Sequence, residues 1–230
     1  ARCYFALALW CQGQTDHAAD MWQQGMRVAQ AANHTPSLAA PTFYGALLAA
    51  LSRTVPELEQ HSAVAVEFTE QHGFQMWLGF AKCLRSWAAL AHDDGAAALK
   101  RVREGRAVLE ATGTRFLAPM VSVIEARALA AAGEHDRALA LLRDTQRQQD
   151  ASGERWMAAE VWRVIGDMHQ RMPGADRAAA EAAYQRAIDL AREQAARSWE
   201  LRAATSLARL WLEHGERQRA AELLGRICDG

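Results

Sequence analysis

Apolar residues recur with a helical period along the whole chain, and no stretch shows the two-residue alternation of a half-buried strand. In one stretch, Ala180, Tyr184 and Ala187 stand at positions i, i+4 and i+7, which share one helix face. A small residue lets a paired helix approach, and the large residue four places on fills the gap that remains. The pattern therefore predicts an all-α protein built from closely packed helices.

This pattern repeats about every forty residues. One step of forty-two, near Met172-Pro173-Gly174, interrupts the series of aligned positions, which are Ala18, Leu58, Ala98, Ala138, Ala180 and Ala220. A helix-breaking position stands five residues before each aligned position, and in the first four repeats a second one stands twenty residues after the first. Glycine and asparagine, which tolerate the left-handed conformation that closes a helix, dominate these breaks: Gly13, Asn33, Arg53, Gly73, Asp93, Gly113, Gly133, Gly153, Ala175 (beside Gly174) and Gly215.

Two breaks per repeat predict two helices per repeat, and therefore about six helical hairpins. We expect the first helices near residues 1–11, 35–52, 74–92, 115–132, 154–172 and 197–214. We expect the second helices near residues 15–31, 56–72, 95–112, 135–151, 176–194 and 217–228.

The A-x3-Y-x2-A spacing at residues 180–187 resembles the signature of tetratricopeptide repeats. Leu207, Ala208 and Trp211 match the large, small and aromatic positions of that family's first helix. The unit is longer than the usual ~34 residues, and HEAT-like repeats would suit the longer period but lack this spacing. The resemblance covers residues 1–230 and implies a single tetratricopeptide-like α-solenoid, a right-handed superhelix of about six hairpins with ~40-residue repeats.

Two shorter stretches, Ser198–Leu224 and Gly73–Leu78, resemble the C-terminal tetratricopeptide region of large bacterial signalling proteins. In those proteins the repeats follow a nucleotide-cyclase-like or transcriptional-activator domain and a P-loop ATPase. The resemblance implies a regulatory, partner-binding segment, and we expect the chain to be a fragment of a longer multidomain protein. Trp77 and Trp199 stand at the same offset from their aligned alanines, and we predict that both lie in the core between repeats.

Charge and cysteine content narrow the possible partners and location. The chain has 26 basic and 27 acidic residues, and its net charge of −1 offers no basic footprint for nucleic acid. The longest apolar run, Cys3–Cys11, is shorter than the ~20 residues needed to cross a bilayer. The four cysteines form no CxxC pair, which favours reduced thiols. We expect a cytoplasmic protein that contacts neither membrane nor nucleic acid directly.

Sequence motifs for catalysis are missing. The chain has no Walker A, GxGxxG, HExxH or GxSxG motif. His92-Asp93-Asp94 could contact a cation, but capping of the following helix explains these residues more simply. No nucleophile, base and orienting group stand out as a set. We therefore expect no enzymatic activity, no cofactor and no metal site in this fragment.

The tetratricopeptide resemblance also implies a binding surface, because that family lines a concave groove with residues of its first helices. The corresponding positions here are apolar toward the N-terminus and rich in arginine toward the C-terminus. Such a groove would hold an amphipathic or acidic peptide, with guanidinium groups taking its carboxylates. As an alternative, the arginines form solvated surface pairs worth about 0.3–0.5 kcal/mol each. The candidate residues are Phe43, Leu47, Phe80, Trp87, Arg127, Arg163, Asp167, Arg202 and Arg209.

Three functional hypotheses follow from this reading. In the first, the chain is a non-catalytic module that receives a protein, a peptide or a small inducer and relays that event to an upstream ATPase. In the second, the repeats are a scaffold for self-association, which makes a homo-oligomer. In the third, the chain is a receptor whose aromatic groove around Phe43, Phe80 and Trp87 holds an apolar effector.

Overall fold

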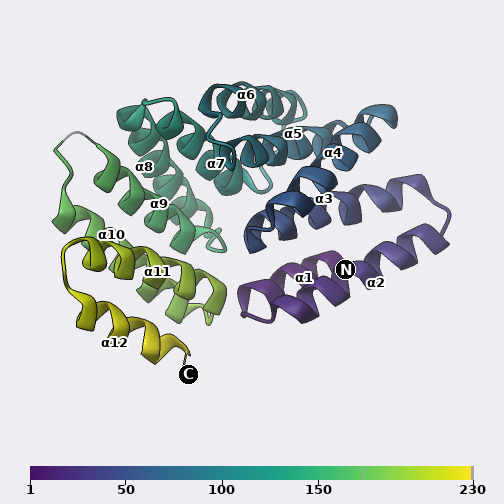
Figure 1. The fold of residues 1–230 in the computed structure, drawn as a ribbon. Helices are drawn as coiled ribbons and strands as arrows, with labels where there is room; N and C mark the ends of the chain where they lie inside the picture. The colour runs from purple at the N-terminus through teal and green to yellow at the C-terminus, as the bar shows by residue number, and fades with distance from the viewer. Residues whose placement is uncertain (173, 229–230) are drawn as a thin grey trace. The chain divides into compact units, whose positions relative to one another are not determined.

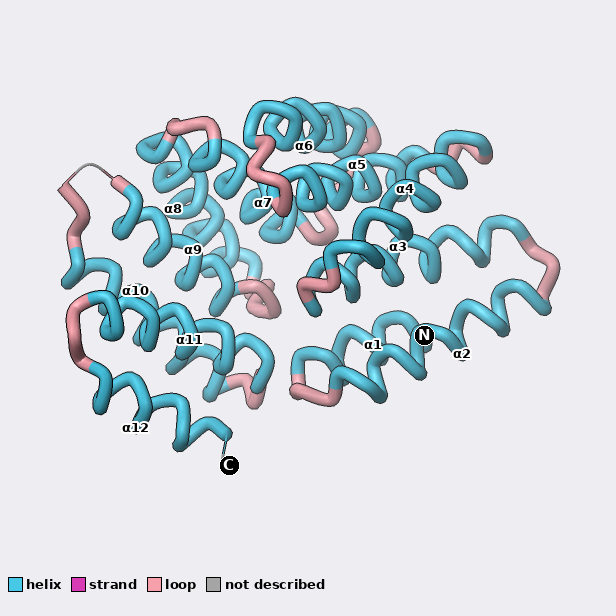
Figure 2. The backbone as a smooth tube through the Cα atoms, in the orientation of Figure 1, coloured by secondary structure: helices cyan, strands magenta, loops and turns pink. Residues whose placement is uncertain are grey.

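The computed structural model describes residues 1–172 and 174–228, and every regular element within them is an α-helix (Figure 2). This confirms the predicted all-α class, and the consecutive helices of the described residues form the six expected hairpins. The helices are α1 (Arg2–Cys11), α2 (Thr15–Ala31), α3 (Thr35–Ser52), α4 (Val55–Gln71), α5 (Gln75–Leu90), α6 (Gly95–Ala111), α7 (Ala118–Ala131), α8 (His135–Ser152), α9 (Ala158–Arg171), α10 (Arg177–Glu193), α11 (Arg197–Glu213) and α12 (Arg217–Cys228).

The chain divides into two compact units, one of Ala1–Trp10 with Gln14–Gly133 and one of Cys11–Gly13 with Glu134–Gly230. In the first unit, α3 packs against α4 and α5, and α5 packs against α6 and α7 (Figure 1). In the second unit, α9 packs against α8, α10 and α11, and α11 packs against α12. The first helices α3, α5 and α9 thus each contact the next first helix of their unit as well as their own hairpin partner, which buries side chains on both faces. A single solenoid over residues 1–230 stays a prediction.

Left-handed residues end the helices where the sequence predicts breaks. Positive φ angles occur at Gly13, Asn33, Arg53, Gly73, Asp93, Gly113, Gly133, Gly153, Gly174 and Gly215. Arg53 (φ 60°) and Asp93 (φ 56°) adopt this conformation although they carry a side chain, so repeat register rather than residue type identified them. Ala195 (φ 51°) closes α10 in the same way and was not predicted, because alanine carries no turn signal.

Two first helices begin later than predicted. Helix α7 begins at Ala118 and not near residue 115, because Leu117 lies in the left-handed region (φ 55°) and cannot continue a right-handed helix. Helix α9 begins at Ala158 and not near residue 154, after a turn in which the Ala158 N–H donates to the Arg155 carbonyl at 3.0 Å. Pro173, in the stretch to which the sequence assigns the longer fourth step, lies outside the described residues.

Small residues bring the helices together, as the sequence predicts. In the fifth hairpin the Tyr184 ring lies against Gly166, where an added Cβ would sit 2.5 Å from the ring. Between the first and second hairpins, the Trp22 ring occupies the equivalent place against Gly45, and its Nε1–H donates to the Pro41 carbonyl at 2.7 Å. These contacts allow α10 to approach α9 closely within one hairpin, and α2 to approach α3 across successive hairpins.

The core of the second unit is built from alanines and large aromatic residues. A cluster of buried residues in α10, α11 and α12 includes Ala180, Tyr184, Leu207 and Trp211. Trp199 at the start of α11 is only 1% exposed, which confirms that it belongs to the core. Trp77 of α5 is partly buried, with its ring centroid 5.3 Å from that of Phe43.

Candidate functional site

The apolar residues predicted to line a groove are packed inside the first unit. Phe43 and Leu47 of α3 and Phe80 of α5 are fully buried, and Trp87 of α5 is nearly so. The Phe43 and Phe80 ring centroids lie 5.4 Å apart, because α3 and α5 pack directly against each other. Arg127 of α7 places its guanidinium carbon 5.5 Å from the centre of the Trp87 ring. Because these rings are buried, a ligand could not contact them in this structure. Ligand binding by these residues stays a prediction.

Three of the charged residues predicted for the C-terminal part of the groove, Arg163, Asp167 and Arg202, form an ion-pair network with Glu160, whereas Arg209 is exposed on α11 and takes no part in it. Arg163 of α9 donates from Nε and Nη2 to the two carboxylate oxygens of Glu160, at 2.8 and 3.0 Å. The expected i,i+4 pair with Asp167 is present, with Nη1 and Oδ2 2.8 Å apart. Arg163 is 4% exposed and Glu160 1%, so the network is buried and not solvated. Arg202 of α11 completes it by donating to Glu160 Oε1 at 2.8 Å.

Neighbouring helices hold this network in place. The Tyr184 hydroxyl of α10 lies 2.8 Å from Asp167 Oδ1 and 2.6 Å from Gln170 Oε1. Burial lowers the pKa of the Arg163 guanidinium, but Asp167 and Glu160 outweigh it and hold that pKa above its ordinary value. Burial, and then the Asp167 charge, raise the pKa of Tyr184. The Arg163 guanidinium therefore stays charged at neutral pH, and the network links α9 to α10 and α11.

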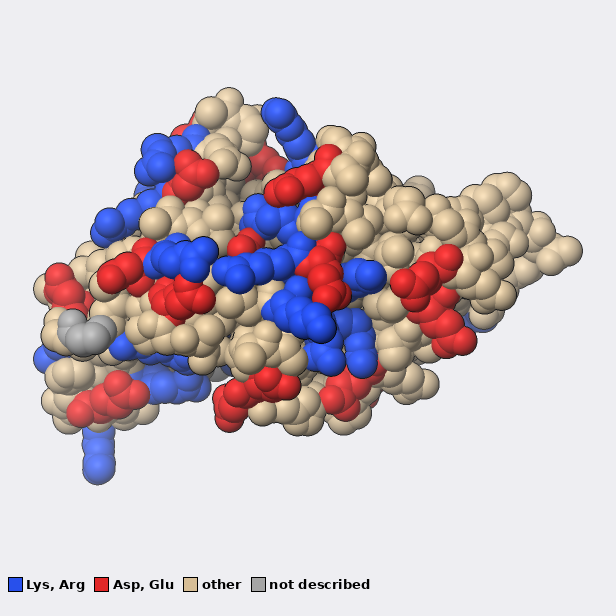
Figure 3. Space-filling model, turned by 90° about the horizontal axis from the view of Figure 1, so that it is seen from above, with Lys and Arg blue, Asp and Glu red and all other residues tan. Residues whose placement is uncertain are grey.

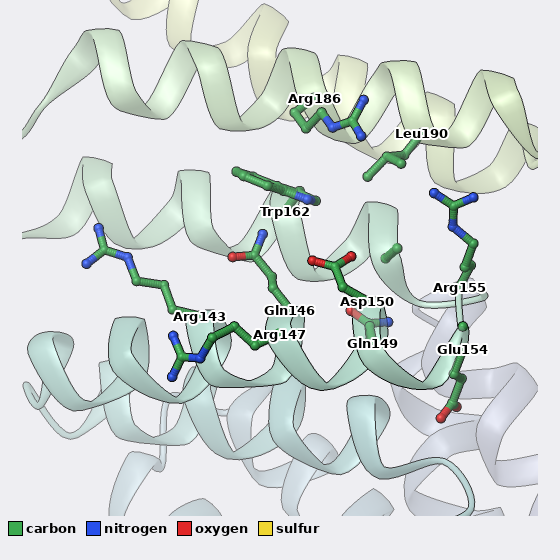
Figure 4. A pocket seen from close by; sticks show the side chains of 12 residues that line it. Arg143, Gln146, Arg147, Gln149, Asp150, Glu154, Arg155, Trp162, Arg186 and Leu190 are labelled. Atoms are coloured by element: carbon green, nitrogen blue, oxygen red, sulfur yellow. The ribbon is translucent and has the colours of Figure 1, made fainter.

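A cleft of about 570 Å³ opens elsewhere in the second unit, between α8, α9 and α10 (Figure 4). Its volume falls within the range of about 300–1,000 Å³ that is typical of ligand sites. The lining combines arginines, carboxylates, two glutamines and an apolar strip. These residues are Arg143, Gln146, Arg147, Gln149, Asp150, Gly153, Glu154, Arg155, Ala158, Trp162, Arg186 and Leu190.

Helical spacing explains how these side chains meet. Arg143, Gln146 and Gln149 stand three residues apart on α8, and Figure 4 shows Gln146 extending from α8 toward Trp162 of α9. Trp162 is partly buried because it packs against the core cluster of the second unit. Gly153 (φ 74°) ends α8 and turns the chain toward α9.

The cleft offers hydrogen-bond donors that the protein does not use. Gln149 is 5% exposed, and the Nε2 atoms of both Gln149 and Gln146 are buried without an acceptor. A buried donor without an acceptor lowers the stability of a folded protein by about 1–3 kcal/mol. Two such amides side by side are therefore unusual. Arg147 and Arg186 pair with acidic residues on their own helices, at 3.0 and 3.6 Å. Arg143 and Arg155 are exposed, and among the described residues no acidic side chain pairs with either guanidinium.

The sequence did not indicate this cleft, because the binding groove was predicted from residues of the first helices. The cleft is lined mainly by the second helices α8 and α10, on which the family's groove positions do not fall. The stretch Arg143–Asp150 is rich in arginine and glutamine, a composition that equally suits an exposed helix face. That stretch becomes the wall of a cavity only because α9 and α10 supply the other lining residues in the folded chain.

The described residues hold no group of three or more His, Cys, Asp or Glu side chains arranged to bind a metal ion. The predicted cap at the start of α6 is confirmed, since Asp94 Oδ1 accepts a hydrogen bond from the Ala97 N–H at 3.0 Å. No helix in the described part of the chain is long and apolar enough to span a membrane. On the face drawn in Figure 3, basic side chains lie among acidic ones, as the near-zero net charge leads one to expect.

Comparison with known proteins places the fold. No family model matches the chain, and no curated protein matches it. Among solved structures, the crystal structure of the apo form of RapI matches with a TM-score of 0.68, over 99% of this chain and 82% of that chain. The sequences are 11% identical, so the likeness concerns the fold alone. The hairpins and this likeness together define an all-α helical-repeat protein of tetratricopeptide-like fold.

Proposed function

We propose that the chain is a non-catalytic regulatory module that binds a protein or peptide partner. The observation that carries the proposal is the cleft between α8, α9 and α10, where two glutamine amides lack acceptors and two arginines stand exposed. Groups of this kind recognise carboxylates and peptide groups, and they are not arranged as a nucleophile with its base.

The repeat architecture supports the same proposal. Helical-repeat proteins present long surfaces made of successive helices, and such surfaces commonly bind other chains. The likeness to the apo form of RapI agrees with a fold of this type. The absence of turnover by this chain and a cytoplasmic location are part of the proposal.

A finer proposal concerns the setting of the module. The resemblance of Ser198–Leu224 to the repeat region of bacterial signalling proteins supports a place downstream of a P-loop ATPase. In that setting, partner binding to the repeats would regulate an attached signalling or transcription-regulating domain. Reading the coding sequence upstream of Ala1 tests this directly, because a P-loop and an effector domain are expected there.

Peptide display with the purified chain tests binding, and an ATP hydrolysis assay on the same sample tests the absence of turnover. We expect reproducible enrichment of a peptide class and no phosphate release. A display that enriches no peptide, together with no binding of any candidate partner, would overturn the proposed module. Hydrolysis of ATP by the chain would overturn its non-catalytic assignment.

A further inference from the structure

We infer that the cleft between α8, α9 and α10 binds an extended acidic peptide segment that carries carboxylates at both ends and an apolar side chain at its centre. This inference rests on the proposed function and names the ligand of that site. It differs from the groove predicted from the first helices, since the cleft is lined mainly by second helices.

The two arginines without acidic partners set the length of the ligand. In Figure 4, Arg143 lies toward one end of the cleft and Arg155 toward the other, with Asp150 and Trp162 between them. Along α8, the ten residues from Arg143 to Gly153 rise by about 15 Å at 1.5 Å per residue. An extended chain covers that distance in about five residues at 3.3–3.6 Å each. A single phosphate or carboxylate is too short to contact both arginines.

The middle of the cleft suits a peptide backbone. Gln149 and Gln146 supply buried amide donors without acceptors, which a peptide carbonyl would satisfy. Asp150 lines the same part of the cleft and can accept from a peptide N–H. A carboxylate in the centre would be repelled by Asp150, so the acidic groups belong at the ends.

Trp162 and Leu190 provide the apolar contact. Trp162 is partly buried and Leu190 almost fully buried, and both line the cleft opposite the α8 glutamines. An apolar side chain placed on the indole would bury further surface at about 25 cal/mol per Å². The cleft volume of about 570 Å³ accommodates one such side chain with its flanking backbone.

Fluorescence polarisation with the full chain tests the inference. The probes are labelled pentapeptides with Glu or Asp at both ends, Leu, Phe or Trp at the centre, and Ser between. The matched probes carry Gln or Asn at the ends. We expect the acidic set to bind and the amide set to bind about tenfold more weakly for each carboxylate replaced, since each loses a charge-assisted hydrogen bond.

Variants of the chain then locate the site. Arg143→Gln and Arg155→Gln should each weaken binding of the acidic peptide about tenfold and reduce its dependence on salt. Arg217→Gln is the matched control, because Arg217 is also exposed in the second unit but lies at the start of α12, outside the cleft. Its affinity should equal that of the unchanged protein.

Gln149→Leu separates a ligand-binding role from a structural one. If the Gln149 amide serves the ligand, the variant loses peptide affinity while its Tm stays the same or rises, because an unsatisfied buried donor is removed. A fall in both Tm and affinity would assign Gln149 to the structure and count against its role in the site.

Other outcomes overturn the inference while leaving the proposed function in place. They are equal binding of acidic and amide peptides, a larger loss in Arg217→Gln than in Arg143→Gln, or displacement of the peptide by an equal concentration of inorganic phosphate. If display enriches no peptide of any composition, the proposed function fails together with this inference.

Discussion

Arg163 and Glu160, one turn apart on α9, form a bidentate ion pair that is almost completely buried. The same Glu160 carboxylate also accepts from Arg202 of α11, so the fifth and sixth hairpins share one anion. Buried pairs of this kind add little net stability over an apolar core, but removing one partner leaves a charge uncompensated. Because Glu160 accepts from arginines of both helices, it fixes how α9 packs against α11.

Replacement of Arg163 should be severely destabilising. Arg163→Met leaves Glu160 and Asp167 without their main donor, and we expect a loss of about 3–5 kcal/mol in the free energy of unfolding. Urea denaturation followed by circular dichroism measures it. Arg209→Met, on the exposed face of α11, is the control and should change stability by less than about 0.5 kcal/mol. Equal effects of the two changes would show that the network is not required.

Two helical glycines of the second unit should respond in opposite directions to alanine. An added Cβ at Gly166 would lie 2.5 Å from the Tyr184 ring, so Gly166→Ala should destabilise by about 1–3 kcal/mol. Gly225 of α12 has no atom within 4 Å of an added Cβ, so Gly225→Ala should stabilise by about 0.5–1 kcal/mol. Thermal unfolding of both variants checks the sign. A stable Gly166→Ala would mean that α9 and α10 are less tightly packed than described.

Glycine in place of Ala195, at the helix end that was not predicted, should stabilise the protein. Ala195 has φ 51°, where a Cβ costs about 1–2 kcal/mol, and Ala195→Gly removes that cost at some expense of unfolded-state entropy. We expect a gain of about 0.5–1 kcal/mol. Ala91→Gly, at a helix end with φ −71°, is the matched control and should lose stability instead. A lower Tm for Ala195→Gly would contradict the left-handed assignment.

The Cys83 thiol should be inert in the folded protein. Burial between α5 and α6 raises its pKa from an ordinary 9.0 to about 12, with Arg106 lowering it and Glu125 raising it slightly. We expect iodoacetamide to modify Cys83 in urea but not in buffer at about pH 9, as followed by mass spectrometry of its peptide.

The same shift predicts how stability depends on pH. The folded state holds the Cys83 proton more tightly than the unfolded state, so this contribution is fully present below pH 9.0 and is lost as pH rises toward about 12. The stability difference between the unchanged protein and Cys83→Ala should therefore shrink over that interval. A constant difference would mean that the thiol is solvated. Among the described side chains Cys3 and Cys11 are also free, and the side chain of Cys228 lies outside them.

Local chemistry explains which helices could be predicted accurately. Glycines and the repeat register mark nearly every helix end, since a left-handed residue is needed wherever one helix closes. The same register identified Arg53 and Asp93, which residue type would have missed. It failed at Ala195 and Leu117, where the surrounding packing imposes a positive φ on residues that do not favour it.

The candidate site was less accessible to prediction. Phe43, Phe80 and Arg163 were identified as facing a groove from their positions on first helices, and they do lie toward neighbouring first helices. Whether the space between two neighbouring first helices is an open groove or is filled by side chains depends on the distance between the helices. The spacing of residues along the sequence does not give that distance. Here α3 meets α5 and α9 meets α11 closely enough to bury these side chains.

The sequence alone predicts the helical class, the forty-residue period and the positions of most turns. Each of these depends on neighbours along one helix or on the backbone preference of one residue. The burial of the Glu160–Arg163 pair and the opening beside Gln149 depend on where separate helices come to rest against one another. Side-chain volumes summed over several helices set those distances, so they emerged only when the chain was folded.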